Sequence, residues 1–284
     1  MEVDGSIQGK KDDYHFLCHR YAKYGYIMAS MNYTLLIKKY KQYNIFRILD
    51  EINSCIESIK NELKNEGFDE NKLELALGGI SAGAHLSLLY GYSIKDSPIP
   101  IKFVINYVGP ISLEPQFFYR IGKNGILLEN ILPKDIENIL KDNSIEKVFK
   151  DESIFLKTMN SFIGDKYSDD EIKEMTINKN ININNDKYKE MLKVVQYAFP
   201  IKYINSNTIP TLCQYGGNDQ LVGVVQYSYL IKLSEEYGNK IEHIYMKNAD
   251  HSLINYDTKD GLNAMREMHY QILNFAKTYF TLDN

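Results

Sequence analysis

A serine between closely spaced glycines, in the pattern G-x-S-x-G at residues 79–83, is the first feature with chemical meaning. It lies between apolar runs at 73–79 and 84–92, which are typical of a buried strand and a packed helix. A strand that turns tightly into a helix at Ser81 would lift the hydroxyl clear of a sheet and point helical N–H groups at a neighbouring oxyanion. The pattern therefore predicts a nucleophilic serine, with the N–H of Ala82 as an oxyanion donor.

A serine hydroxyl is a weak nucleophile and needs a base that is itself oriented by an acid. Asp219 and His251 follow Ser81 in that order, and each comes after an apolar run typical of a buried strand, at 211–215 and 241–246. Loops at the carboxyl ends of parallel strands meet at one edge of their sheet. Order and placement together predict a catalytic triad of these three residues.

Two other residues compete for the roles of base and acid. His85 lies four residues after Ser81 on the predicted helix, where we expect it to pack beside the strand. Asp250 adjoins His251, and neighbours on one loop seldom point at each other, so Asp219 is the better acid. A turn rich in glycine and serine can also be only a turn, and the strand and helix around it favour the catalytic interpretation.

The rest of the chain alternates between apolar runs and amphipathic segments. Runs at 26–33 and 101–108 are typical of strands buried on both faces. Apolar residues recur at helical spacing over 45–63 and 262–279. Strands that alternate with helices predict an α/β fold, a mainly parallel sheet covered by helices on both faces.

Residues 113–203 interrupt this alternation with charged helical segments and Asn-rich loops. We expect them to form a helical cap insertion over the serine, within a single domain that spans 1–284. The acidic stretch 165–174 is expected to be a solvated helix start with Ser168 as its N-cap, and not a metal site, because no histidine accompanies the acids. Four aromatic residues of the insertion can line an acyl or alcohol pocket or simply pack it on the sheet: Phe117, Phe118, Tyr119 and Phe162.

The composition excludes several classes of protein. The net charge is −4, and 33 Lys and Arg against 37 Asp and Glu do not indicate a surface for nucleic acid. The three cysteines lie far apart, which excludes a disulfide framework and a cysteine zinc site and fits a reducing compartment. No apolar run approaches the roughly 20 residues of a membrane span, and residues 1–10 show no signal peptide. We expect a cytoplasmic protein without cofactor or metal.

These motifs resemble the α/β-hydrolase superfamily, in the carboxylesterase branch that includes hormone-sensitive-lipase-like and feruloyl-esterase-like proteins. The resemblance is carried by residues 78–85, 215–222 and 250–252. Residues 24–35 also look like the strand that leads into the family's N-Y-R-L turn, with Thr34 where arginine is usual. The resemblance covers nearly the whole chain apart from the insertion. It implies the α/β-hydrolase fold, the triad, and hydrolysis of carboxylic esters without a cofactor.

The resemblance also implies a second oxyanion donor, on a His-Gly-Gly-Gly-like loop after an early strand. The sequence has no such loop, and residues 1–10 resemble the segment just after it. In the family that strand lies between those predicted at 26–33 and 73–79, and residues 1–3 are too short to supply it. We expect an N-terminally truncated chain whose flanking strands pair directly, with weak activity and marginal solubility. A signal peptide in the lost part would change the expected location.

Three functions are open on these residues. The first is a serine esterase that acts on a small-molecule ester through an acyl-enzyme intermediate. The second is a truncated hydrolase-fold protein with little or no turnover, and the third is an amide-cleaving peptidase or formamidase on the same triad. Labelling of Ser81 by a fluorophosphonate separates the second from the other two. Nitrophenyl esters compared with anilides separate the first from the third.

Overall fold

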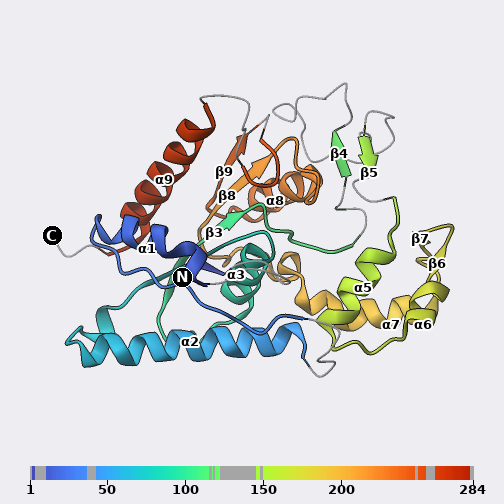
Figure 1. Cartoon of the computed structure of the whole chain (residues 1–284), viewed down its shortest axis with the longest axis horizontal. Coiled ribbons are helices and arrows are strands. Elements are labelled where there is room, and N and C mark those ends of the chain that lie inside the picture. The colour runs from blue at the N-terminus through green and yellow to red at the C-terminus, as the bar shows by residue number, and fades with distance from the viewer. Residues whose placement is uncertain are drawn as a thin grey trace.

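The computed structural model of the 284-residue chain is built around a parallel sheet (Figure 1). The described residues are 2–3, 11–36, 43–114, 117, 119–121, 145–147, 150–246, 249–253 and 260–281. Within them, five strands are hydrogen-bonded in the order β1-β2-β3-β8-β9, and every pairing is parallel. The strands are β1 (Glu2–Val3), β2 (Leu75–Ile80), β3 (Ile101–Tyr107), β8 (Thr211–Gly216) and β9 (Ile241–Met246).

Helices cover both faces of the sheet (Figure 1). One face carries α2 (Ile45–Asn65), α3 (Ala82–Ser93) and α8 (Val224–Tyr237). The other face carries α1 (His15–Ala22) and α9 (Asp260–Tyr279). The strands alternate accordingly, since Val104 and Cys213 pack on the first face and Phe103 and Leu212 on the second. The predicted α/β fold is therefore confirmed.

Helix α2 begins where Asn44 accepts the Arg47 N–H at 3.0 Å as an N-cap. Its Glu51 carboxylate accepts the N–H and the hydroxyl of Thr34, at 2.8 and 2.6 Å, and lies 3.2 Å from Nε of Arg47. Thr34, which stands where arginine is usual, thus binds an acid of α2, and the same acid also contacts the positively charged Arg47. The face toward the sheet is apolar and buried: Ile45, Ile48, Leu49, Ile52 and Ile56.

Between β3 and β8 the described residues are mostly helical, and these helices lie together beside the sheet (Figure 1). They are α5 (Ser153–Phe162), α6 (Asp169–Glu174) and α7 (Asp186–Val195), followed by 3-10 turns at Gln196–Ala198 and Pro200–Tyr203. The sequence did not indicate the two short antiparallel pairs in this segment. They are β4 (Tyr119–Ile121) with β5 (Ile145–Lys147), and β6 (Thr176–Ile177) with β7 (Asn180–Ile181).

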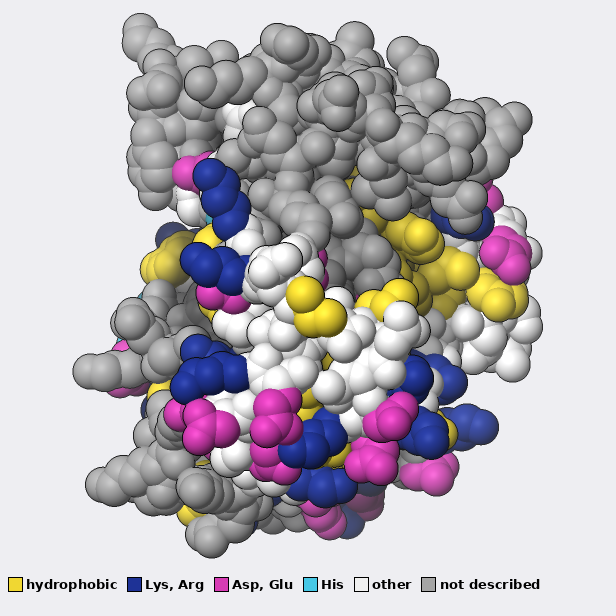
Figure 2. All heavy atoms as spheres, turned by 90° about the vertical axis from the view of Figure 1, so that its right-hand side faces the viewer, with side chains coloured by type: hydrophobic (Ala, Val, Ile, Leu, Met, Phe, Trp, Pro, Cys, Tyr) yellow, Lys and Arg dark blue, Asp and Glu magenta, His cyan; other side chains and the backbone are white. Residues whose placement is uncertain are grey.

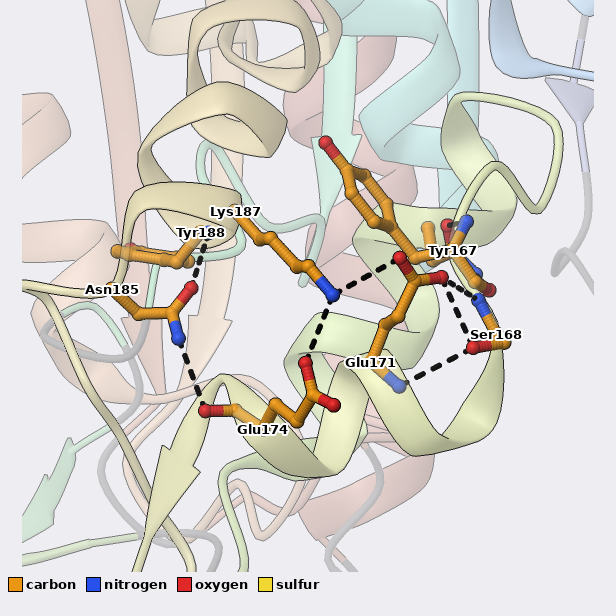
Figure 3. Close-up of polar contacts among 8 residues, drawn as sticks. Tyr167, Ser168, Glu171, Glu174, Asn185, Lys187 and Tyr188 are labelled. Atoms are coloured by element: carbon orange, nitrogen blue, oxygen red, sulfur yellow. Dashed lines mark hydrogen bonds and ion pairs between the residues drawn. The ribbon is translucent and has the colours of Figure 1, made fainter.

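The acidic start of α6 is bound by its own neighbours (Figure 3). Ser168 caps the helix by accepting the Glu171 N–H, and the Glu171 carboxylate accepts the Ser168 N–H at 2.9 Å, so the predicted N-cap is confirmed. Lys187 of α7 lies 3.1 Å from the Glu171 carboxylate and 2.9 Å from that of Glu174, and the Asn185 side chain donates to the Glu174 carbonyl. Acidic and basic side chains are intermixed on this side of the molecule (Figure 2).

Two expectations for the N-terminal part are wrong. Residues 26–33 form no strand beyond one isolated bridge residue, and Ile27 is 61% exposed. Glu2–Val3, expected to be too short, form β1 and pair with Gly78 and Gly79 on the side of β2 away from β3. The two flanking segments therefore do not pair directly. Because β1 presents only two residues, a strand beyond it would find few ladder hydrogen bonds.

Candidate active site

Ser81 lies in a sharp turn between β2, which ends at Ile80, and α3, which begins at Ala82. Its φ of 56° and ψ of −117° form a conformation that residues with a side chain rarely adopt. The Ser81 N–H donates to the Tyr107 carbonyl at 2.8 Å, and the Ser81 carbonyl accepts the His85 N–H at 3.0 Å. The strand, turn and helix expected around this serine are present.

The glycines around the turn allow close packing of backbone. A Cβ at Gly79 would lie 2.3 Å from the carbonyl carbon of Gly83 and 2.6 Å from the nitrogen of Ala84. A Cβ at Gly109, in the loop after β3, would lie 2.5 Å from Cβ of Ala84 and 2.9 Å from the nitrogen of His85. Only glycine therefore lets β2, α3 and the loop after β3 approach this closely.

The candidate oxyanion donor is the first residue of α3, Ala82. The first N–H groups of a helix have no acceptor within the helix, and the helix dipole adds positive potential there. The Ser81 N–H already donates to the Tyr107 carbonyl, which leaves the first turn of α3, starting at Ala82, to face an anion. In the absence of a glycine-rich loop, Gly5 and Gly9 are the other candidates for a second oxyanion donor, and both lie outside the described residues.

Asp219 and His251 are in direct contact. Oδ2 of Asp219 lies 2.8 Å from Nδ1 of His251, and the carboxylate is almost fully buried. Oδ1 accepts the N–H groups of Leu221 and Val222, at 2.7 and 2.9 Å. Because the carboxylate oxygen accepts, Nδ1 carries the proton, and Nε2 is the ring nitrogen that is left for other chemistry.

The loops after β8 and β9 that carry these two residues are joined through backbone. The Asn218 N–H donates to the Ala249 carbonyl at 2.9 Å, and a Cβ at Gly216 would lie 2.4 Å from the Asp250 carbonyl oxygen. The Asp250 side chain accepts the Ser252 N–H at 2.8 Å. Its carboxylate thus closes its own loop, and Asp219 is the acid that contacts the imidazole.

The loop after β9 packs into the apolar cluster on the face of the sheet that carries α9. Leu253 is buried with a left-handed φ of 56°, and it belongs to the same apolar cluster as Ile80, the residue before Ser81. Since β2, β8 and β9 are parallel, their carboxyl ends share one edge of the sheet. Within the described part of the chain no hydrogen bond joins Ser81 to His251. The three candidate residues share this edge.

Residues 4–233 match the BD-FAE family. The chain belongs to the BD-FAE family. This is an esterase and feruloyl-esterase-like family of α/β-hydrolases, so the predicted superfamily is confirmed, and so is the predicted class of carboxylic ester hydrolase. No curated protein matches the chain in sequence.

Solved structures of similar fold are bacterial esterases. Est2 of the Planctomycetes species Thermogutta terrifontis, with propionate bound, is 13% identical with a TM-score of 0.60 over 100% of this chain and 84% of that one. Inhibited esterase B from Lactobacillus rhamnosis is 13% identical with a TM-score of 0.59, over 98% and 76%. Est2 phosphonylated by sarin is 14% identical with a TM-score of 0.57, over 100% and 84%. At such identities the likeness shows the fold.

His85 of this BD-FAE chain is 2% exposed, in the interior rather than at the edge of the sheet. Its Nδ1 donates to the Pro110 carbonyl at 2.7 Å, and its ring centroid lies 5.5 Å from that of Phe162. Burial lowers the pKa of this histidine to about 4. The ring is therefore neutral near pH 7, and it packs as expected.

A closed hydrogen-bond network behind the turn was not found by sequence analysis. The Asn106 side chain donates to the Tyr215 hydroxyl at 2.9 Å, and that hydroxyl donates to the Gly109 carbonyl at 2.6 Å. The Gly109 N–H donates to Oδ1 of Asn106 at 2.8 Å, which closes the network. This hydrogen bond bridges Val108, whose φ is 47°. An asparagine within the otherwise apolar run 103–108 was the one signal that could have pointed to this network.

The aromatic residues expected to line a pocket have different surroundings. Phe117 is buried against α8. Phe162 ends α5, packs on His85, and borders a surface pocket of about 310 Å³. Phe118 and the side chain of Tyr119 lie outside the described residues. Apolar side chains of the pocket include Leu36, Ile154 and Ile172.

Within the described residues no group of three or more His, Cys, Asp or Glu side chains is placed to hold a metal ion. No helix in the same part of the chain is long and apolar enough to cross a membrane. Cys18, Cys55 and Cys213 form no disulfide.

We expect Gly79→Ala to lower the free energy of unfolding by about 1–3 kcal/mol, because the new Cβ would overlap the backbone of Gly83. Gly78→Ala is the matched control, since its Cβ would meet the Ile105 side chain at 3.3 Å and needs only a small shift. Urea denaturation of both variants measures the difference. An equal loss in both would show that the overlap with Gly83 adds no cost beyond that of a side chain at the end of β2.

We also expect His85 to make the free energy of unfolding depend on pH. Its pKa is near 6.5 in the unfolded chain and about 4 in the folded one, because burial disfavours the charged ring. The unfolded state binds the proton first, so stabilisation present above about pH 6.5 is lost as the pH falls toward about 4. Wild type should lose on the order of 3 kcal/mol more than His85→Asn over this window. Parallel pH curves of unfolding free energy would contradict this.

Proposed function

We propose that this protein cleaves carboxylic esters with Ser81 as nucleophile, His251 as general base and then acid, and Asp219 as the residue that orients the imidazole. The observation that carries the proposal is the 2.8 Å contact between Nδ1 of His251 and Oδ2 of Asp219. It lies at the edge of the sheet where β2 turns at Ser81. With Nδ1 occupied, Nε2 is the nitrogen that exchanges a proton with the nucleophile.

The reaction then runs in two halves. Nε2 of His251 takes the hydroxyl proton while Oγ of Ser81 attacks the ester carbonyl carbon. The tetrahedral intermediate collapses, and the alcohol leaves with that proton to give the acyl-enzyme. Water next gives a proton to Nε2 and attacks the acyl carbon, which releases the acid and returns the proton to Oγ. In both halves the N–H of Ala82 donates to the oxyanion.

Asp219 suits its role because its carboxylate is fixed. It is 2% exposed, and the N–H groups of Leu221 and Val222 bind Oδ1. Only Oδ2 is left to face the imidazole. A negative charge fixed beside Nδ1 holds the ring in one tautomer and stabilises the imidazolium that forms during attack.

We further propose that residues 113–203 cap this site within a single domain. Phe162 of α5 packs on His85, one helical turn after Ser81, and also borders the pocket of about 310 Å³. The pocket wall mixes polar side chains, such as Lys157 and Asp165, with apolar ones, and the apolar part suits the acyl or alcohol group of a small ester. Est2 has been seen with propionate and with butyrate bound, so short acyl esters are the first substrates to test.

We predict that Ser81→Ala, His251→Ala and Asp219→Asn each lower the hydrolysis of p-nitrophenyl acetate by about 10⁴-fold or more. Thermal unfolding should change little. In Asp219→Asn the side-chain oxygen can still accept the two N–H groups of its loop, while the imidazole loses its correct tautomer. Because the three residues act as a unit, a double variant should cost little more than the worse single one.

Asp250→Asn is the control, since Asp250 is the other acid beside His251 and closes only its own loop. We expect wild-type rates from it. A crippled Asp250→Asn and an active Asp219→Asn would reverse the assignment of the acid. A folded wild-type protein whose Ser81 resists a fluorophosphonate would instead favour an inactive hydrolase-fold protein, and faster cleavage of anilides than of esters would favour an amidase.

A further inference from the structure

The segment 113–203 leaves and rejoins the sheet through two stretches that lie side by side. The Ile201 N–H donates to the Ile111 carbonyl at 3.1 Å. We call residues 110–112 and 198–201 the neck. Its central residues are almost fully buried: Ile111, Ser112, Ala198 and Phe199. Two buried polar side chains, one from α3 and one from α8, bind this neck.

The first side chain is His85 of α3. Its Nδ1 donates to the Pro110 carbonyl on the outgoing stretch at 2.7 Å. Since a carbonyl only accepts, the neutral ring carries its proton on Nδ1, and Nε2 is buried without a hydrogen-bond partner. The ring also packs on Phe162 at the end of α5. This side chain therefore contacts the outgoing stretch of the neck and the insertion beyond it. Helix α3, which carries it, also contacts the turn Pro200–Tyr203 on the returning stretch.

The second side chain is Gln226, which is fully buried in the first turn of α8. Its Oε1 accepts the N–H groups of Ile111 and Ser112, at 2.9 and 3.3 Å. Its Nε2 donates to the Ser112 carbonyl at 2.8 Å. A single amide thus satisfies three backbone groups of the outgoing stretch, which would otherwise be buried without these partners.

Each of these helices begins just after a residue of the proposed triad. Helix α3 starts directly after Ser81, and α8 starts at Val224, after the short loop that follows Asp219. We propose that His85 and Gln226 form a clamp that fixes the insertion relative to Ser81 and Asp219, and thereby sets the acyl chain length that the enzyme accepts. They are positioning residues, and the proposal rests on the ester hydrolysis proposed above.

The clamp acts through distance. The end of α5 follows the neck, because His85 contacts both the Pro110 carbonyl and the Phe162 ring. Phe162 in turn borders the pocket. A displacement of the insertion by about 1 Å would change the space around the acyl chain, beyond the ester carbonyl, more than it would change the immediate surroundings of Ser81. A short acyl ester therefore depends mainly on the triad, whereas a long one depends on the triad and on the position of the insertion.

The test compares His85→Leu and Gln226→Met with wild type on p-nitrophenyl acetate and p-nitrophenyl octanoate. Both substitutions roughly keep side-chain size and remove the hydrogen bonds to the neck. We expect the ratio of kcat/KM for octanoate to that for acetate to change by about tenfold, mainly through KM for octanoate. Amide exchange in a peptide over residues 110–114 should become about tenfold faster in Gln226→Met.

The controls are Ser87→Ala on α3 and Ser234→Ala on α8. Both serines are buried, but their hydroxyls donate within their own helices, to the Gly83 and Ile231 carbonyls. Neither control should change the ratio or the exchange at the neck. His85→Asn, which keeps an N–H near the position of Nδ1, should restore part of the wild-type ratio.

An unchanged ratio in folded His85→Leu and Gln226→Met proteins would overturn the proposal, even if exchange at the neck rises. An equal change in the serine controls would also overturn it. If Gln226→Met does not fold, His85→Leu carries the test, with His85→Asn as the variant that restores part of the ratio. If wild type neither hydrolyses acetate nor reacts with a fluorophosphonate, the proposed function fails. Amide hydrogen exchange over residues 110–114, compared between wild type and Gln226→Met, then decides whether the clamp exists.

Discussion

The backbone conformation of Ser81 is the constraint on which the rest of the site depends. A residue with a side chain held at a φ of 56° costs on the order of 1–3 kcal/mol, and it persists only where its surroundings over-determine it. Here the Tyr107 carbonyl takes the Ser81 N–H, and Gly79 lets the start of α3 lie against β2. The first N–H groups of α3 are thereby brought to the edge of the sheet where the Asp219 and His251 loops lie.

The same kind of strain recurs in two other loops at this edge of the sheet. Val108 after β3 and Leu253 after β9 are buried and apolar, yet both have a left-handed φ. Neither side chain can stabilise such a backbone by hydrogen bonding, so the surroundings must offset the cost. For Val108 the closed network of Asn106, Gly109 and Tyr215 does this, and for Leu253 burial in the apolar cluster under α9 does. Strain of this kind is frequent at functional sites, and in this chain Asp165, Asn178 and Lys179 of the insertion also have a left-handed φ.

Features that depend on residues close together in the chain were predictable. The turn at Ser81, the apolar face of α2 and the N-cap at Ser168 all follow from patterns shorter than a helix, where spacing and side-chain type decide the outcome. The pairing of Asp219 with His251 was predictable for a different reason. Once the strands are parallel, their carboxyl ends must share an edge, so the order along the chain is enough to bring these two loops together.

Only the tertiary structure decided which distant groups meet. The sequence determined that residues 26–33 are apolar, but a strand forms only where a neighbouring backbone is free to pair, and Glu2–Val3 offer just two residues. Gln226 binds Ile111 across a separation of 115 residues, and His85 binds the Pro110 carbonyl across 25. The partner in each case is a backbone amide or carbonyl, a group that nearly every residue carries. A local pattern therefore cannot single it out, and only the packing of α3 and α8 against the neck does.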